Sequence, residues 1–122
     1  MCWGVVFCLF SVILGAFSAH ALKGILTDSH LSSFETGVRY QMYHGLTLLL
    51  LGLNSDKLHQ SILSARLMIY GTLLFSGSIY LLNLQALIGI SLPFLGPITP
   101  IGGFFLISGW SILLISLIKK TK

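Results

Sequence analysis

The sequence is short of charge. Only 8% of its 122 residues are Asp, Glu, Lys or Arg, with three acidic residues against seven basic ones. Soluble domains carry about 25% charged residues, so this scarcity excludes a water-soluble globular domain. The basic residues are scattered or stand at the ends of apolar segments and form no patch. Despite the formal net charge of +4, we therefore expect no binding of nucleic acid.

Cysteine is scarce as well. Cys2 and Cys8 are the only two cysteines, and on a helix their spacing places them on well-separated faces, where they cannot bridge each other. We therefore interpret both as small apolar side chains.

Catalytic and metal-binding motifs are also missing. Ser76-Gly77-Ser78 lies in a helical stretch without an acid–base pair, and the glycine-rich pieces have no P-loop lysine. Zinc ligation by histidines with Glu35 is a weaker alternative, because no His–His pair has the four-residue spacing of a strong motif. We expect no enzyme activity, no cofactor and no metal.

The sequence is rich in long hydrophobic segments. Hydrophobic residues make up 55% of the chain, and the mean hydropathy is +0.94. A membrane-spanning helix needs about 20 residues, so the chain accommodates four spans and short loops. The sequence predicts an all-α, four-helix transmembrane bundle forming a single domain over residues 1–122. The helices are expected at about 2–22, 33–53, 62–82 and 100–118.

The first apolar segment has a rival interpretation. Ala19-His20-Ala21 resembles a signal-peptidase site, so residues 2–22 could be a cleaved signal peptide. The segment has no basic N-terminal region, and its apolar run exceeds the usual length of about 7–15 residues. We therefore interpret it as a retained helix.

The second helix carries most of the polar groups. Ser32-x-x-Glu35 has the form of a capping box, which places the helix start near residue 33 after a loop over 23–33. Glu35 and Arg39 stand four residues apart with the acid first, the favourable order for an ion pair.

The later boundaries follow from turn and breaker residues. The hydrophilic stretch 54–61 predicts a tight hairpin, and Asn83 with Gln85 is expected to end the third helix. Residues 86–97 contain two glycines and two prolines, which predict an interfacial connection rather than a span. Pro100 then suits the first turn of the fourth helix.

Small residues recur along the helices, where they let neighbouring helices approach closely. The expected packing positions are Ser11, Gly15, Ala19, Gly45, Gly71, Gly77, Gly102 and Gly109. Because these positions exceed what one small bundle needs, they also suggest a homo-oligomer or a membrane-protein partner.

Four sequence blocks together resemble one known family. They are GAFSAHALKG at 15–24, FETGVRYQMYHGLTLLLLG at 34–52, FSGSIYLL at 75–82 and GPITPIGGFFLISGW at 96–110. The family is the small membrane proteins typified by bacterial YgdD, known as domain of unknown function 423 or UPF0382 membrane proteins, with a eukaryotic transmembrane protein 256-like branch. The resemblance covers nearly the whole chain and implies an integral inner-membrane protein with four helices. It implies no activity and no catalytic residue.

Ionisable groups inside a membrane are expensive and are default candidates for function. We consider a polar cluster of His20, Glu35, Arg39, Tyr40, His44, Ser76 and Tyr80 that opens toward the outer side. A histidine there could relay protons or bind a polar headgroup. In the structural interpretation, Glu35 and Arg39 neutralise each other and His44 fixes the bundle register through a hydrogen bond to another helix.

Two classes of function follow. The favoured one is a non-enzymatic membrane protein that acts as an oligomer or as a small subunit of a larger assembly in the lipid bilayer. The alternative is an oligomeric transporter or channel for protons or a small polar solute. Basic residues collect on the side of the termini and of the 54–61 loop, so the positive-inside rule predicts a plasma-membrane protein with cytoplasmic N- and C-termini.

Overall fold

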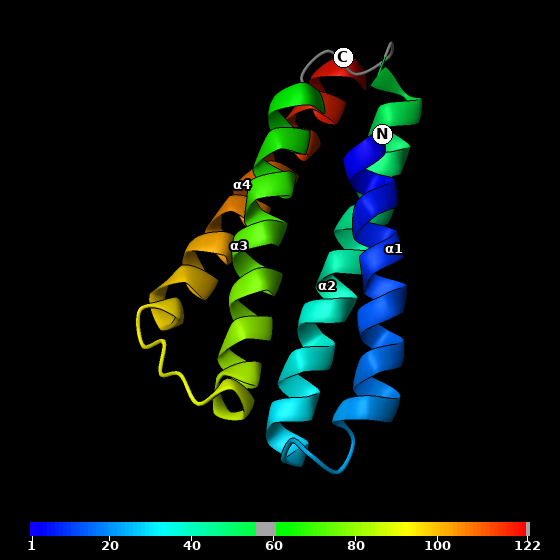
Figure 1. Ribbon diagram of the computed structural model, residues 1–122. Coiled ribbons are helices and arrows are strands. Elements are labelled where there is room, and N and C mark those ends of the chain that lie inside the picture. The colour runs from blue at the N-terminus through cyan, green and yellow to red at the C-terminus, as the bar shows by residue number, and fades with distance from the viewer. Residues whose placement is uncertain (56–60, 122) are drawn as a thin grey trace.

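Four long helices build the part of the chain that the structure describes, residues 1–55 and 61–121 of a computed structural model. They are α1 (Cys2–Phe17), α2 (Asp28–Leu53), α3 (Ser61–Ile88) and α4 (Leu95–Thr121), and a π-helical turn, η1 (Ser18–Leu22), continues α1. Consecutive helices run in opposite directions, and both termini lie at the same end (Figure 1). The all-α, four-helix class is confirmed. Most of the hairpin predicted over 54–61 lies outside the described residues.

Three segments are long and apolar enough to cross a membrane: Cys2–Leu22, Ile62–Gln85 and Leu95–Lys119. The helix α2 has 26 residues, but polar residues such as Glu35 and Gln41 lower its apolarity. It packs against both α1 and α3, so it occupies the same depth as the apolar helices. Large apolar side chains also cover the outside of the bundle, among them Phe10, Phe104 and Leu114. This surface suits lipid and not water.

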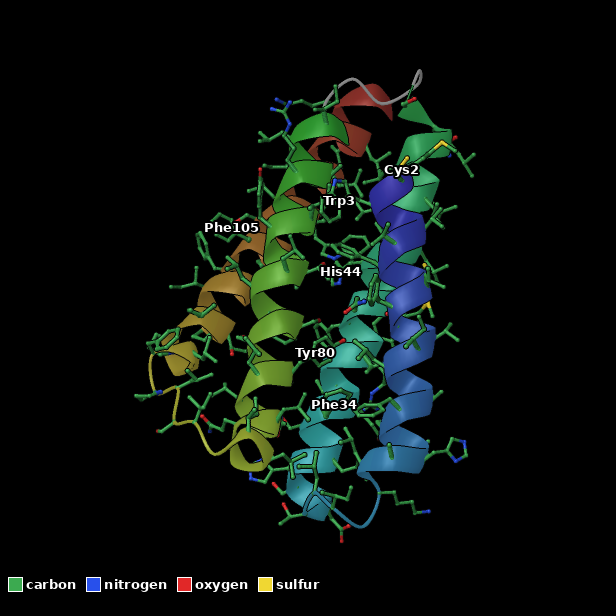
Figure 2. All side chains as sticks on the ribbon, in the orientation of Figure 1. Cys2, Trp3, Phe34, His44, Tyr80 and Phe105 are labelled. Carbon is green, nitrogen blue, oxygen red and sulfur yellow. The ribbon has the colours of Figure 1, made fainter. Side chains whose placement is uncertain are left out.

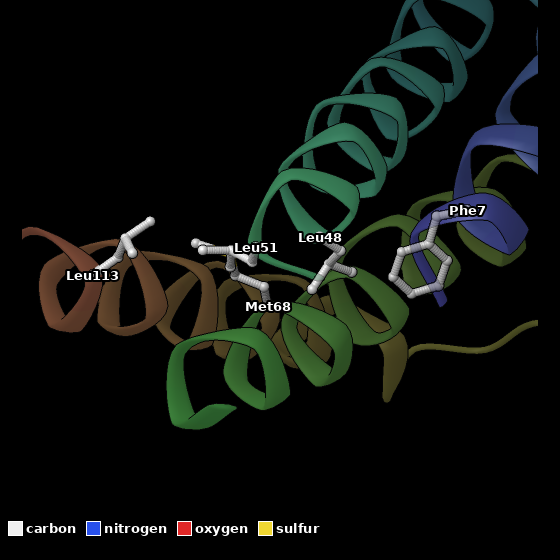
Figure 3. Packing of buried hydrophobic residues seen from close by; sticks show 5 residues of the cluster. All are labelled: Phe7, Leu48, Leu51, Met68 and Leu113. Carbon is white, nitrogen blue, oxygen red and sulfur yellow. The ribbon is translucent and has the colours of Figure 1, made fainter. Parts of the chain in front are cut away.

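Two apolar clusters fill the interior. One lies toward the end of the bundle that holds the termini and joins all four helices through Phe7, Leu48, Leu51, Met68 and Leu113 (Figure 3). The other lies at the opposite end, around Phe34. The ring of Phe34 is fully buried and lies 4.8 Å from that of Tyr80, measured between centroids. Polar contacts of Gly37, Gln41 and His44 lie between these two clusters.

Glycines allow the helix pairs to approach closely. A Cβ at Gly102 would meet the backbone of Phe75, and one at Gly71 would lie 2.8 Å from Leu106. On the α1–α2 side, a Cβ at Gly45 would lie 2.8 Å from Cys8 Sγ. These glycines therefore serve contacts within the bundle, because larger side chains would force the backbones apart.

The remaining predicted packing positions are more varied. Gly109 lies close to α3, Gly15 makes an ordinary van der Waals contact with Val38, and Ser11 is buried. Ala19 is exposed. Gly77 differs from the expectation of close packing, because a Cβ there would meet nothing within 4 Å.

The second helix begins earlier than residue 33, so the capping-box prediction is wrong. Thr27 is the N-cap, and its Oγ1 accepts a hydrogen bond from the backbone N–H of His30 at 3.3 Å. Asp28 in the first turn adds a favourable charge at the positive end of the helix dipole. The connection before α2 is a tight turn in which Gly24 has φ +88°, a conformation that L side chains rarely adopt.

The boundary between α3 and α4 also differs from the prediction. The helix α3 continues past Asn83 and Gln85 and ends at Ile88, followed by Gly89 with φ +70°. The N–H of Ile90 donates to the carbonyl of Gln85 at 3.3 Å, which completes a Schellman-type cap. The helix does not end at Asn83, because the side-chain amide of this residue has hydrogen-bond partners inside the bundle.

The helix α4 begins at Leu95, five residues before the predicted start. Pro97 falls in its first turn, where a missing N–H costs little, and Pro100 lies inside the helix. The predicted connection over 86–97 is therefore shortened to residues 89–94.

Candidate functional site

The inner face of α2 carries a row of polar contacts to the other helices. We call His30, Ser33, Gly37, Gln41 and His44 the inner row. At its first end, His30 Nδ1 lies 2.8 Å from Asn83 Oδ1 on α3, and Asn83 Nδ2 donates to Ser33 Oγ at 3.0 Å. One turn on, Ser76 Oγ donates to the carbonyl of Gly37 at 2.8 Å.

Gln41 links three helices at the middle of the row. Its Nε2 donates to the carbonyl of Phe7 on α1 at 3.0 Å, and its Oε1 accepts from the hydroxyl of Tyr80 on α3 at 2.8 Å. Gln41 is buried, with 7% of its surface exposed. Because an unpaired amide in an apolar interior is costly, these bonds fix the register of α2 between its neighbours.

His44 ends the row, and both of its ring nitrogens have partners. The indole N–H of Trp110 on α4 donates to Nε2 at 3.1 Å, so Nε2 must be an acceptor. The proton therefore resides on Nδ1, which donates to the carbonyl of Tyr40 at 2.7 Å. Figure 2 shows His44 between the two helical hairpins, above Tyr80 and Phe34. This geometry holds a neutral imidazole.

The structure brings the predicted polar cluster together only in part: the ring of Tyr40 stacks against His44 with centroids 6.1 Å apart, but the whole set does not form one site. His20, Glu35, Arg39 and Tyr40 are exposed, His44 and Ser76 are buried, and Tyr80 is half-buried. Arg39 does not pair with Glu35 as expected, but donates to Thr36 Oγ1 at 3.4 Å. The bond that His44 donates stays within its own helix, and its interhelical partner is a donor on α4.

The side chains that form the hydrogen bonds between helices were not identified from the sequence. These are His30, Ser33, Gln41, Asn83 and Trp110. A signal was available, because the positions of the inner row are separated by three, four, four and three residues. Such spacing predicts a single helix face, and the polar residues on that face needed partners.

The outward side of α2 has a different character. We call Glu35, Arg39 and Tyr43 the outer face; all three are exposed, Tyr43 by 56%. Glu35 and Arg39 line a hollow of about 230 Å³ between α2 and the end of α1, together with Gly15 and Ala19. Unlike the inner row, the outer face combines two opposite charges with exposure.

A zinc site was a weaker alternative in the sequence. Among residues 1–55 and 61–121, no three His, Cys, Asp or Glu side chains come close enough to hold a metal ion. Three of the four histidines lie in this part of the chain, and they belong to different neighbourhoods: His20 in η1, His30 at Asn83 and His44 at Trp110.

Comparisons with known proteins give a consistent picture. A family model described as "Protein of unknown function (DUF423)" matches residues 14–103. A UPF0382 membrane protein of Staphylococcus haemolyticus is 42% identical over 117 residues, covering 95% of this chain and 92% of its own. The UPF0382 membrane protein YwdK of Bacillus subtilis is 40% identical over 119 residues, covering 95% and 93%. No solved structure matches. The chain belongs to the DUF423 family of UPF0382 membrane proteins.

Proposed function

We propose that this membrane protein is non-enzymatic and acts as an assembly, with the outer face of α2 as the contact between two copies. The observation that supports the proposal is the exposure of Glu35 and Arg39 at the depth of a membrane span. Charged side chains in a span almost always face protein or a water-filled cavity, because hydrocarbon solvates them poorly. In one protomer these two face outward.

Their depth follows from the hollow that they share with α1. Gly15 and Ala19 line the same hollow and lie within the candidate span Cys2–Leu22. Ala19 is three residues and Gly15 seven residues before its end, which is roughly 5–10 Å at about 1.5 Å per residue. Because the hydrocarbon core is about 30 Å thick, this distance supports a depth for the neighbouring Glu35 and Arg39 within the third of the core nearest the turn before α2.

A second copy suits this surface better than a partner of one sign. The outer face carries one acid and one base a helical turn apart, so it is neutral as a whole and complementary to itself. A two-fold axis along the membrane normal would set Glu35 of each copy against the other's Arg39. Tyr43, one turn further on, adds an aromatic anchor of the kind that is enriched at interfaces.

The glycines give no comparable support for a partner surface. Gly45, Gly71 and Gly102 already serve contacts between helices of one protomer. The transport alternative is less well supported than assembly, because His20, Glu35 and Arg39 are exposed whereas His44 is buried.

Charge reversal tests the contact. In native-lipid vesicles, single-molecule photobleaching should count two copies, and Glu35→Arg should weaken their association about tenfold, or about 1.4 kcal/mol. The double variant Glu35→Arg/Arg39→Glu should restore it, because the opposite signs face each other again. Lys23→Gln, a charge change in the turn before α2, is the matched control. A single copy at every protein density, or no rescue by the double variant, would contradict the proposal.

We further propose that the protein resides in the plasma membrane with both termini in the cytoplasm. The end of the bundle with the termini has Arg66 and Lys119, and by sequence Lys57 also falls between α2 and α3. The opposite end has two connections: residues 23–27, with Lys23 as their one basic residue, and residues 89–94, with none. Reporter domains fused to either terminus should be active only as cytoplasmic fusions; activity of an exported reporter would reverse the assignment.

A further inference from the structure

A second feature lies on the inner side of α2, away from the outer face. A cavity of about 300 Å³ opens between α1 and α3, with Gln41 of α2 among its lining residues. Its other lining residues are Trp3, Val6, Phe7, Phe10, Leu14, Thr72, Leu73, Gly77 and Tyr80. Phe10, Leu73 and Trp3 are also exposed on the surface of the protomer, so the mouth opens sideways toward the lipid phase.

One polar side chain in this cavity has no partner. Thr72 is 1% exposed, and its Oγ1 makes no hydrogen bond within the described residues. A threonine in a helix commonly donates to the carbonyl four residues before it, as Thr47 does to Tyr43 at 2.8 Å. Thr72 makes no such bond and lines the cavity, so its hydroxyl is available to an occupant. A buried, unpaired hydroxyl is costly unless something binds it.

The walls restrict what could fill the space. No charged residue lines the cavity, which excludes an ionised headgroup. Four of the lining residues are aromatic, and the volume lies at the lower limit of small-molecule sites, about 300–1,000 Å³. Aromatic side chains favour a flat partner over a saturated chain. The space therefore suits one ring and not a whole lipid.

We propose that this cavity binds the flat, neutral, carbonyl-bearing ring of a lipid-soluble molecule, of the quinone class, with Thr72 donating to a ring carbonyl. The tail of the molecule leaves through the mouth between α1 and α3 into the bilayer. Gln41 and Tyr80 complete the polar side of the site. The amide of Gln41 keeps one N–H beyond its bond to Phe7, so it can donate to a second oxygen. This site does not depend on the outer face or on dimer formation.

Gly77 offers a way to fill the cavity without disturbing a contact. A Cβ there meets nothing within 4 Å, so Gly77→Leu places its side chain in the space that the ring would occupy. Thr72→Val removes only the hydroxyl and keeps the shape of the side chain. Gly96→Leu adds the same bulk at another open glycine, and Ser11→Ala removes the other buried hydroxyl without a partner. These two variants are the matched controls.

Trp3 provides the signal. In a Trp110→Phe background, titration of the full-length protein in lipid nanodiscs with decylbenzoquinone should quench the fluorescence of Trp3 with a saturable component. Decylbenzene, which has the tail and a ring but no oxygen, should not compete, and a fatty methyl ester should compete only weakly. Thr72→Val should weaken the saturable binding three- to tenfold, and Gly77→Leu should abolish it.

Other results would overturn the proposal. Quenching that rises linearly without saturation would mean partition into the bilayer only. Equal competition by decylbenzene would make the cavity a groove for hydrocarbon, and equal competition by the methyl ester would assign it to an acyl ester. Unchanged binding in Thr72→Val and Gly77→Leu, with helicity preserved by circular dichroism, would place the quinone elsewhere. A loss of binding in Gly96→Leu or Ser11→Ala would show that the effect is not local.

Discussion

At the scale of single residues, the polar side chains of α2 divide by face. Gln41 and His44 point inward and each has at least one partner on another helix, whereas Glu35 and Arg39 point outward. An inward polar group stabilises one arrangement of helices, because every other register leaves it unpaired. An outward charged group at membrane depth instead calls for a partner outside the protomer. Structure and assembly are thus assigned to different faces of one helix.

The bond between Trp110 and His44 should be measurable as a coupling energy. His44→Phe and Trp110→Phe should each destabilise the bundle, and a double-mutant cycle should give a coupling of about 0.6 kcal/mol, the average for such bonds in membranes. Reversible unfolding in mixed micelles supplies the free energies.

The tautomer of His44 is an independent check on the same bond. Nitrogen NMR should find the proton on Nδ1 and a bare Nε2, because Nε2 accepts from Trp110. A coupling of zero together with the opposite tautomer would contradict this hydrogen bond.

At the scale of elements, the hydrophobic pattern predicted the number, order and type of the helices. It did so because three strongly apolar segments and one mixed segment, each long enough for a span and separated by polar breaks, leave few alternatives. The ends were predicted poorly. A capping box at Ser32 and a proline at 100 are locally valid signals, but α2 and α4 extend beyond them because Thr27 offers an earlier cap and Pro97 is tolerated in a first turn.

The candidate site was predicted only in part, for a related reason. His44, Ser76 and Tyr80 do lie in the interior, but a single sequence does not reveal which side of α2 faces α3. The sequence predicts Glu35 and Arg39 in one cluster with His44, because charges in membranes usually face protein or a cavity. The spacing of the inner row indicates which side of α2 faces the other helices. This becomes visible only when all polar residues of the row are considered together.

The start of α2 is testable by removing each of the two competing caps. Thr27→Ala should destabilise the protein by about 0.5–2 kcal/mol, because the N–H of His30 loses its acceptor. Ser32→Ala, the matched control, should change stability by less than about 0.5 kcal/mol, because Ser32 is an exposed residue within the helix. The same unfolding assay reports both. A larger effect at Ser32 than at Thr27 would restore the later helix start.

At the scale of the whole molecule, two helical hairpins meet along α2 and α3. One apolar cluster lies beyond His44 at the end with the termini, and the other surrounds Phe34 near the opposite end. Within the described residues, the buried side-chain atoms without a hydrogen-bond partner are Ser11 Oγ and Thr72 Oγ1. At the surface, the outer face of α2 exposes two charges in a span. Assembly through this face would satisfy those charges without a new conformation.

The most direct test measures whether lipid reaches the outer face in a native membrane. The native cysteines are first removed by Cys2→Ser and Cys8→Ala. In this background, a spin label at Tyr43→Cys is compared with one at Leu114→Cys, an exposed apolar position on α4. Dissolved oxygen concentrates in hydrocarbon and relaxes labels that face lipid. We predict that the label at 43 is shielded and immobile and that the label at 114 is accessible. Equal accessibility at the two positions would mean that lipid covers the outer face and would contradict the account.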